Sequence, residues 1–356
     1  MRPRGSLCWI AFALSCAFLF GCEEESNPTT PEVTPKPELL TYWYWDLASP
    51  PAFPDGSVLA ANLREAIFWY NIESNLGASR RDFNPSLSSN QDGLVTTLDL
   101  EVYVLPSDPA RWAGIMTGFP GNTEGTNAPL DLSDFTFLDI WINDFRPNPT
   151  DRKGKLYIDL GFVDEDFFEP EKNEWNDEDQ ERDGFQQCWD DTGVDGEFNA
   201  NPDCVVYNIG VLRDEESGDP NNDASGDDYV PQRIDGRFTK INGTERNRRH
   251  DTEDLDGSGQ LDELNAYFRY EIDLSSAAAV DIRRDHPNYD GFNDPNHEDD
   301  SWRLYRIKLS DYAVISTNGR IPHRDHITHV RIWSEALSEV FSAARRIQIA
   351  GFEPTN

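Results

Sequence analysis

The sequence is poor in positive charge: its 356 residues include 31 Lys and Arg against 66 Asp and Glu, a formal net charge of −35. Nucleic acids are bound mainly through basic patches that neutralise their phosphates, and this chain has no such patch of useful size. We therefore expect no nucleic-acid partner. High charge alone would favour disorder, but aromatic residues make up 12% of the chain, which indicates a folded core.

The sequence also lacks the local signatures of common enzyme sites, with no G-x-S-x-G, P-loop or dinucleotide-binding pattern. Carboxylates are abundant, and a glycosidase needs two of them at a set separation across a cleft. The nearest candidate is the acidic run 164–169, which reads DEDFFE and lacks the E-x-D-x-x-E spacing of sandwich glycosidases. Such a run is more typical of strand-end or calcium-ligand acids. We therefore expect a protein that is not an enzyme.

Histidine is scarce as well, and three of the six lie close together. His323, His326 and His329 recur every third residue, and on a helix they would share one side and could bind zinc. The segment Thr328–Trp333, however, alternates in polarity like a strand. This alternation favours loop and edge histidines over a zinc site.

Apolar runs are short. The run at residues 8–20 is too short to span a membrane and follows a basic start of the chain, as in a secretory signal peptide. The sequence LFGC that ends at Cys22 resembles the bacterial lipobox, which implies removal of residues 1–21 and lipidation of Cys22. The membrane would then be a partner through the lipid anchor. An ordinary signal peptide or a buried helix is the alternative.

The segment after Cys22 indicates where the protein is exported. Residues 23–26 read EEES, which resembles the signal that sends Bacteroidetes-type lipoproteins to the outer face of the outer membrane. Residues 22–40 are rich in Pro, Thr and Glu, as in a semi-extended linker. We expect an outer-membrane lipoprotein exposed on the cell surface, with the periplasmic face as the alternative.

Cysteine is limited to five residues. Two leave with the signal peptide and Cys22 would carry lipid, so Cys188 and Cys204 remain as a pair. In the oxidising envelope we expect them to form a disulfide, and closing a loop of some 16 residues would stabilise the fold by roughly 3 kcal/mol. Two free thiols or a metal site are the alternatives.

Short alternating segments are plentiful, with apolar residues at every second position and Gly, Pro, Asn and Asp between the segments. They lie at 98–104, 138–142, 156–162, 268–274, 305–309, 330–332 and 347–349. The pattern predicts an all-β, antiparallel, jelly-roll-like β-sandwich with one wet face per sheet, formed by residues 41–353 as a single domain. One short amphipathic helix is expected over Val58–Tyr70.

Residues 164–265 interrupt this alternation with an acidic, Gly- and Asn-rich insertion, which at that length must be functional, ion-ordered or disordered. Near its end, alternate oxygen ligands follow the twelve-residue calcium-loop pattern. The predicted Ca²⁺ ligands are Asp254, Asp256, Ser258, the backbone carbonyl of Gln260, Asp262 and Asn265. Ser258 replaces an acid or amide and Asn265 replaces a bidentate Glu, so we expect weak binding suited to extracellular calcium. A solvated turn without an ion is the alternative.

Several segments, in order along the chain, resemble one extracellular module of the SprA family, the outer-membrane translocon of type IX secretion and gliding motility. They are WAGIM at 112–116, FLDIWIND at 137–144, LYIDLGFVDED at 156–166, the calcium-loop segment 251–262, YFRY at 267–270, WRLYRI at 302–307 and THVRIW at 328–333. SprA is several times longer and forms a giant transmembrane barrel. The resemblance therefore implies the fold and envelope setting of one module, not translocation.

Together these patterns predict a non-enzymatic surface lipoprotein, a calcium-stabilised sandwich with a binding or assembly role among envelope proteins. The alternative is a carbohydrate-binding surface lipoprotein, because segment 345–353 also resembles jelly-roll carbohydrate-binding modules. Aromatic side chains on an open face would then stack on glycan rings, with Trp43, Trp45, Trp69 and Trp112 as the candidates. Core packing would put the same side chains out of reach.

Overall fold

In the computed structural model, all described residues belong to one compact unit, Thr34–Asn356. These are residues 40, 45–65, 67–71, 78–79, 93–102, 111–119, 129–146, 154–167, 175, 233–234, 237–238, 252–275, 302–317, 319–335 and 345–356. Cys22, Cys188, Cys204 and Trp43 lie outside them, so the predicted lipidation and disulfide stay predictions. Among the described residues, no helix has the length and apolar character needed to cross a membrane.

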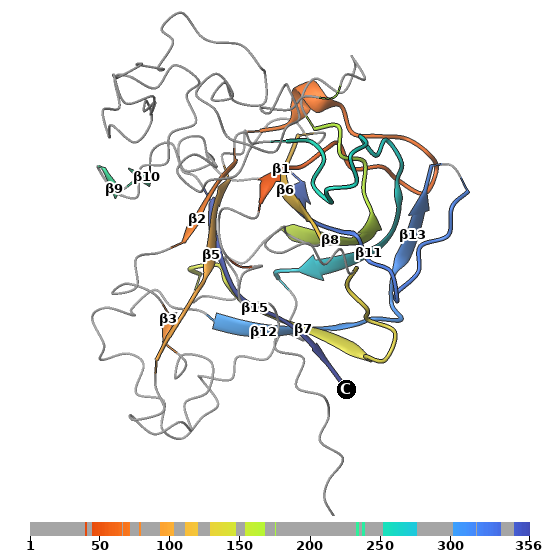
Figure 1. Ribbon diagram of the computed structural model, residues 1–356. Helices are drawn as coiled ribbons and strands as arrows, with labels where there is room; N and C mark the ends of the chain where they lie inside the picture. Colours follow the sequence, from red (N-terminus) through yellow and green to blue (C-terminus); the bar gives the residue numbers. More distant parts are fainter. Residues whose placement is uncertain are drawn as a thin grey trace, which may run out of the picture. The chain divides into compact units, whose positions relative to one another are not determined.

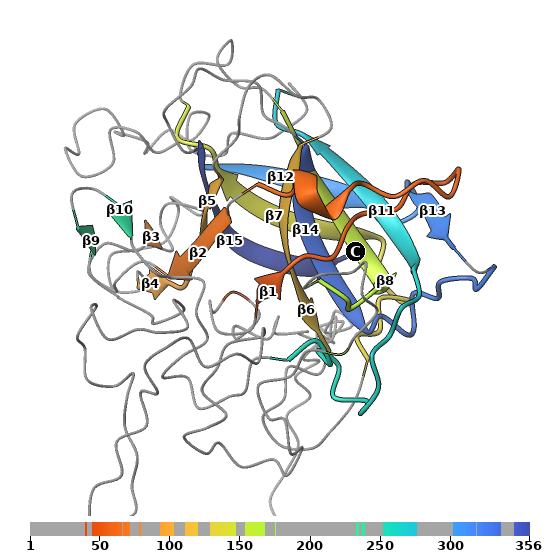
Figure 2. The same cartoon turned by 90° about the horizontal axis from the view of Figure 1, so that it is seen from above.

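Two antiparallel sheets form the body of the fold (Figures 1 and 2). The six-stranded sheet has the order β1 (Asp46–Leu47), β6 (Trp112–Gly118), β14 (His329–Glu335), β8 (Lys155–Phe162), β11 (Ala266–Asp273) and β13 (Ala313–Ser316). The five-stranded sheet has the order β12 (Trp302–Lys308), β7 (Phe137–Asn143), β15 (Arg345–Thr355), β5 (Leu98–Val102) and β2 (Ile67–Asn71). Two further pairs are β3 (Ala78–Ser79) with β4 (Leu94–Val95), and β9 (Arg233–Ile234) with β10 (Arg237–Phe238).

The main core lies between the two sheets and draws on the alternate residues of both. On β8, for example, Leu156, Ile158 and Leu160 belong to this core, and Val330 and Ile332 join it from the neighbouring β14. The intervening residues point to the other face, as the two-residue period of a strand requires. The all-β sandwich and the positions of its main strands are therefore confirmed.

The helix predicted over Val58–Tyr70 is wrong. The structure has a single 3-10 turn at Ala61–Leu63, followed by β2 at Ile67–Asn71. β2 pairs with β5 along its whole length, and its Ile67 and Trp69 are buried in the main core. Branched and aromatic side chains favour a strand, and packing against β5 overrides the helical spacing that the apolar residues also satisfy.

The expectation of one wet face per sheet is wrong for the six-stranded sheet. A second apolar cluster lies on its outer face and includes Trp112, Met116, Tyr157, Tyr267 and Trp333. The chain from Ala48 to Leu63 covers part of this face, with Ala48, Ala52, Phe53, Leu59 and Leu63 packed into the cluster. Part of the outer face of this sheet is therefore buried as well.

Polar contacts fasten the covering segment to the sheet. The Tyr267 hydroxyl donates to the carbonyl of Ala52 and accepts from its N–H, both at 3.1 Å. The Arg331 guanidinium donates to the carbonyl of Ser49 at 3.1 Å. Because these groups are buried, each bond removes the penalty of an unpaired polar atom.

Between these contacts lies a buried charge network centred on Asp159. Its side chain is fully buried and pairs with Arg269 at 2.7 Å and with Arg331 at 2.8 Å. Trp333 donates its indole N–H to the same carboxylate at 3.1 Å, and its ring lies 4.6 Å from the Arg269 guanidinium. Charge-assisted hydrogen bonds and the stacking of the guanidinium on the indole ring give the charged groups of this network partners within the protein. This indicates that the network has a structural role.

Candidate metal site

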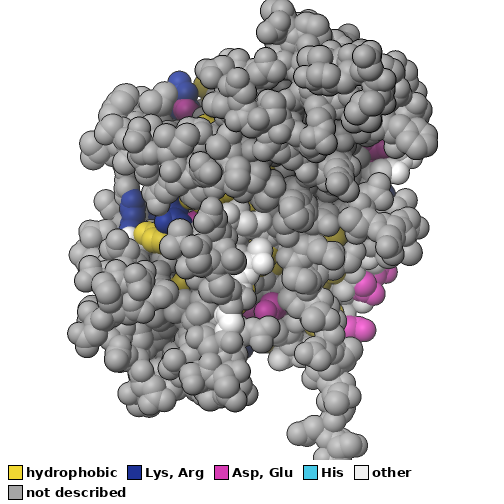
Figure 3. Space-filling view, turned by 60° about the vertical axis from the view of Figure 1, so that its left-hand side comes forward, with side chains coloured by type: hydrophobic (Ala, Val, Ile, Leu, Met, Phe, Trp, Pro, Cys, Tyr) yellow, Lys and Arg dark blue, Asp and Glu magenta, His cyan; other side chains and the backbone are white. Residues whose placement is uncertain are grey.

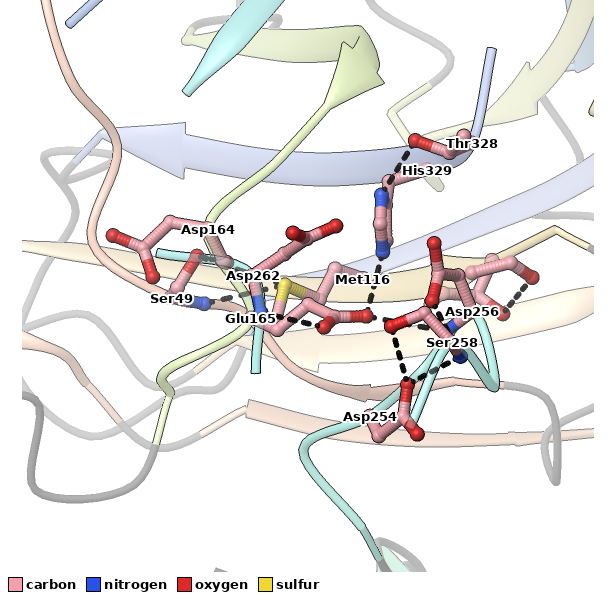
Figure 4. Close-up of polar contacts among 12 residues, drawn as sticks. Ser49, Met116, Asp164, Glu165, Asp254, Asp256, Ser258, Asp262, Thr328 and His329 are labelled. Carbon is pink, nitrogen blue, oxygen red and sulfur yellow. Dashed lines mark hydrogen bonds and ion pairs between the residues drawn. The ribbon is translucent and has the colours of Figure 1, made fainter. Parts of the chain in front are cut away.

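The predicted calcium loop turns its oxygens inward. The Asp254 carboxylate accepts N–H bonds from Ser258 at 2.8 Å and Gly259 at 2.7 Å, and Asp256 accepts one from Ser258 at 2.9 Å. The Ser258 hydroxyl lies 3.0 Å from the carbonyl oxygen of Gln260. Gly259 has φ of 77°, in the left-handed region where a side chain would be strained. These contacts bring together Asp254, Asp256 and Ser258, which Figure 4 shows, and the Gln260 carbonyl.

The last two predicted ligands help attach the loop to the sheet. Asn265 is buried, and its side-chain oxygen accepts an N–H bond from Asp164, just beyond β8, at 3.2 Å. The Asp262 carbonyl accepts the N–H of Glu165 at 2.7 Å, and the Asp262 N–H donates to the Glu165 carboxylate at 3.1 Å. The Asn265 oxygen is thus used to join the loop to the end of β8.

Glu165 occupies the central position under the loop, although it was not among the predicted ligands. One oxygen accepts the N–H of Asp256 at 3.1 Å and the other accepts the N–H of Asp262 at 3.1 Å. The first oxygen is also 2.8 Å from Nε2 of His329 on β14. The acidic run after β8 was the sequence signal, since it suggested strand-end or calcium-ligand acids without singling out Glu165.

The three histidines fall into two classes. His323 and His326 are exposed, as predicted for loop positions. His329 is fully buried at the start of β14, between β6 and β8, so the expectation of an edge or loop position is wrong for this residue. Its ring points from the sheet toward Glu165 and the loop (Figure 4).

A close backbone approach also holds the loop in place. A side chain at Gly118, the last residue of β6, would overlap the backbone of Leu255 and Asp256. The loop therefore rests directly on the end of the sheet. Its acids consequently lie against the protein on one side, and Asp254, Asp256 and Asp262 are only partly exposed.

Burial raises the pKa of several carboxyl groups here. Desolvation is the largest cause for Glu165, Asp254 and Asp262, and the negative charge of Asp256 raises the pKa of all three further. Desolvation also raises the pKa of Asp164 to about 6. A cation among these groups would favour their ionised forms and remove much of this cost.

The aromatic candidates for sugar stacking do not form an open platform. Trp45, Trp69 and Trp112 are each 1% exposed: Trp45 and Trp69 lie in the core between the sheets and Trp112 in the outer cluster. A stacking residue must present its ring face to the ligand, so the interpretation of these three as sugar ligands is wrong. On the face shown in Figure 3, the described basic side chains form only small groups.

No protein-family model matches the chain, and no curated protein matches it. The loop, Glu165 and His329 must therefore be interpreted from their own geometry.

Proposed function

We propose that the protein is a non-enzymatic module of the cell envelope whose sandwich is stabilised by Ca²⁺ bound in the loop 254–265. The supporting observation is the convergence of oxygens from Asp254, Asp256, Ser258 and the Gln260 carbonyl in one tight turn. Calcium prefers six to eight oxygen ligands in flexible geometry, and a set with few carboxylates binds at the weak, extracellular end of its range.

Calcium would act here on the attachment of the loop. The acids of the loop are held against Glu165 and the end of β6, where burial raises their pKa and like charges repel. A divalent ion neutralises this repulsion, so the loop stays packed on the six-stranded sheet instead of opening toward solvent. The ion is therefore a structural component, with no role in a reaction.

The envelope setting of the proposal comes from the sequence. The lipobox-like segment ending at Cys22 would anchor the module to the outer membrane, and the SprA-like segments fit an assembly or binding role beside secretion or gliding components. A surface module with a calcium-ordered sandwich suits that role because its folded surface would persist in the calcium-containing medium outside the cell. Recovery of the lipidated protein from envelope extracts with defined protein partners tests this part of the proposal.

Thermal unfolding with calcium and with chelator tests the calcium site. At a calcium concentration ten times Kd, binding stabilises the native state by roughly 1.4 kcal/mol, so we expect Tm to rise by a few degrees. Asp254→Ala should abolish the rise. Asp131→Ala is the matched control, because Asp131 accepts bonds from the N–H and hydroxyl of Ser133 in a similar exposed turn. Equal Tm values for the wild type with and without calcium contradict the proposal.

A further inference from the structure

A second group of potential metal ligands lies beneath the calcium loop. One ring nitrogen of His329 and one carboxylate oxygen each of Glu165 and Asp256 all lie within 4.8 Å of one another. The side chains of His329 and Glu165 are fully buried, and Asp256 is partly exposed on the loop side. The three residues come from β14, from the end of β8 and from the loop, so the fold itself assembles them (Figure 4).

The surroundings of His329 fix which of its ring nitrogens is protonated. The Thr328 hydroxyl lies 3.0 Å from the carbonyl oxygen of Gly161, which can only accept, so the hydroxyl donates its one hydrogen there. The same hydroxyl is 2.9 Å from Nδ1 of His329 and must therefore accept a hydrogen from it. Nδ1 is protonated, and the lone pair of a neutral ring is on Nε2.

This lone pair faces a carboxylate. Nε2 lies 2.8 Å from Glu165, whose two oxygens already accept the N–H groups of Asp256 and Asp262. At 2.8 Å a shared proton joins these two atoms, and a zinc ion that replaced the proton would require them to move apart to about 3.3 Å. Histidine ligands in metal sites typically donate their second ring N–H to a neighbouring acceptor, and Thr328 supplies that acceptor here.

We propose that His329, Glu165 and Asp256 bind a divalent transition metal of the Zn²⁺ class. Zinc accepts mixed imidazole and carboxylate ligands, whereas calcium binds oxygen almost exclusively, so the nitrogen ligand distinguishes this site from the loop above it. Two ligands about 2.1 Å from one zinc ion lie at most about 4.2 Å apart, so a small movement of the surface residue Asp256 closes the group.

The zinc site is independent of the proposed calcium function but shares Asp256 with it. Zinc needs His329 and Glu165, which calcium does not, and calcium needs Asp254 and Ser258, which zinc does not. The two proposals can therefore fail separately. With both ions bound, the Asp256 carboxylate would contact the calcium ion in the loop and the zinc ion held by the sheet. The two ions would thereby reinforce the attachment that the Asp256 N–H already makes to Glu165.

Zinc uptake by the intact protein tests the site directly. Equilibrium dialysis in millimolar calcium should show one tightly held Zn²⁺ per chain. We expect His329→Gln to weaken zinc affinity by at least about 100-fold, and Thr328→Val, which removes the hydrogen-bond acceptor of the ring, to weaken it by about 10–100-fold. His326→Gln is the matched control, since that histidine is exposed and the variant should keep its zinc, and His329→Gln should keep the calcium response because His329 is not a calcium ligand.

A measurement without variants guards against misfolded mutants. In the Co²⁺-loaded wild type, NMR should show one strongly shifted, slowly exchanging ring N–H, the Nδ1–H bonded to Thr328. The proposal is overturned if the wild type takes up no zinc above the level of nonspecific binding, if His326→Gln loses zinc as His329→Gln does, or if no shifted ring N–H is found. In each of those cases the proton alone bridges His329 and Glu165.

Discussion

Two buried carboxylates near the outer face of the six-stranded sheet lie in different electrostatic surroundings. Asp159, in the middle of β8, is fully buried and pairs with the guanidinium groups of both Arg269 and Arg331. Glu165, just past the end of β8, is equally buried, and its ion-pair partner is the imidazole of His329. Positive charge exceeds negative charge around Asp159, whereas further acids gather around Glu165.

This difference separates a carboxylate whose charge the protein compensates fully from one that lies among further acids. Around Asp159, two guanidinium groups and an indole N–H donate hydrogen bonds to the carboxylate, so the protein itself compensates the negative charge. Around Glu165, the neighbours are backbone N–H groups, an imidazole and the carboxylate of Asp256. Burial is the main cause that raises the pKa of Glu165, and the charge of Asp256 raises it further. Cations from solvent can lower the free energy of the second region but have no place in the first.

The largest expected effect comes from breaking the self-compensated region. Asp159→Asn removes the negative charge between two buried guanidinium groups, and breaking such a pair from one side costs about 3–5 kcal/mol. We expect urea unfolding at pH 7 to show a loss of that size, with or without metal. Lys155→Gln is the control, because the Lys155–Glu271 pair is exposed and such pairs contribute at most about 1 kcal/mol. Equal losses in both variants would contradict the comparison.

Replacing an acid in the region around Glu165, where acids are in excess, should change stability less, and should raise it instead of lowering it. The pKa of Asp164 is raised to about 6 by burial, so the metal-free native state holds this proton more tightly than the unfolded chain does. The stabilisation is complete below about pH 4 and is lost as the pH rises through about 6. Asp164→Asn should therefore be more stable than the wild type at pH 7, by on the order of 2–3 kcal/mol.

The measurement is urea unfolding of both proteins in chelator from pH 4 to pH 8. The difference between them should grow between about pH 4 and pH 6 and then stay level. Asn retains the side-chain oxygen that accepts the Asp166 N–H, so the local turn is preserved. A difference that does not change with pH would show that Asp164 is ionised throughout, against the comparison.

The smallest effect is expected from moving the acidic loop without changing any charge. Gly118→Ala places a methyl group against the backbone of Leu255 and Asp256, and overpacking of this kind costs about 1–3 kcal/mol. We expect this variant to lose much of its response to calcium as well, since the loop can no longer rest on β6. Gly93→Ala, at an exposed position with open space around it and no positive φ, is the control for glycine replacement, and should keep the calcium response.

The strands were predictable because their signal is local. Alternation at 156–162 and 347–349 depends only on which neighbours are apolar, and β8 and β15 are found at those positions. The apolar residues of the segment Val58–Tyr70 fit the spacing of a helix, and those at its end also fit the alternation of a strand. Pairing with β5 selects the strand, and no local pattern encodes that pairing.

The burial of the outer face could not be predicted in the same way. Asp159, Arg269 and Arg331 alternate with apolar residues, and isolated charged residues in a strand ordinarily indicate a solvent-facing side. They are buried because three strands bring them together, and Arg331 is 172 residues from Asp159 in the sequence. Only the paired network makes burial of these charges acceptable.

The candidate metal residues show the same division between local and distant information. The turn from Asp254 to Gln260 follows from its own spacing and was predicted, whereas Glu165 and His329 are 164 residues apart in the sequence. Glu165 lies in an acidic run and His329 in a series of spaced histidines, but neither pattern indicates that the two residues meet. Their meeting depends on the pairing of β8 with β14, which the sequence pattern does not specify.

The attachment of the segment 48–52 to the six-stranded sheet has a mechanical consequence. A pull on the chain upstream of Trp45 enters the fold here and loads the β1–β6 pairing together with the bonds of Ser49 and Ala52 to Arg331 and Tyr267. Because these bonds are buried and share the load, the sandwich would resist a pull applied to the chain before Trp45.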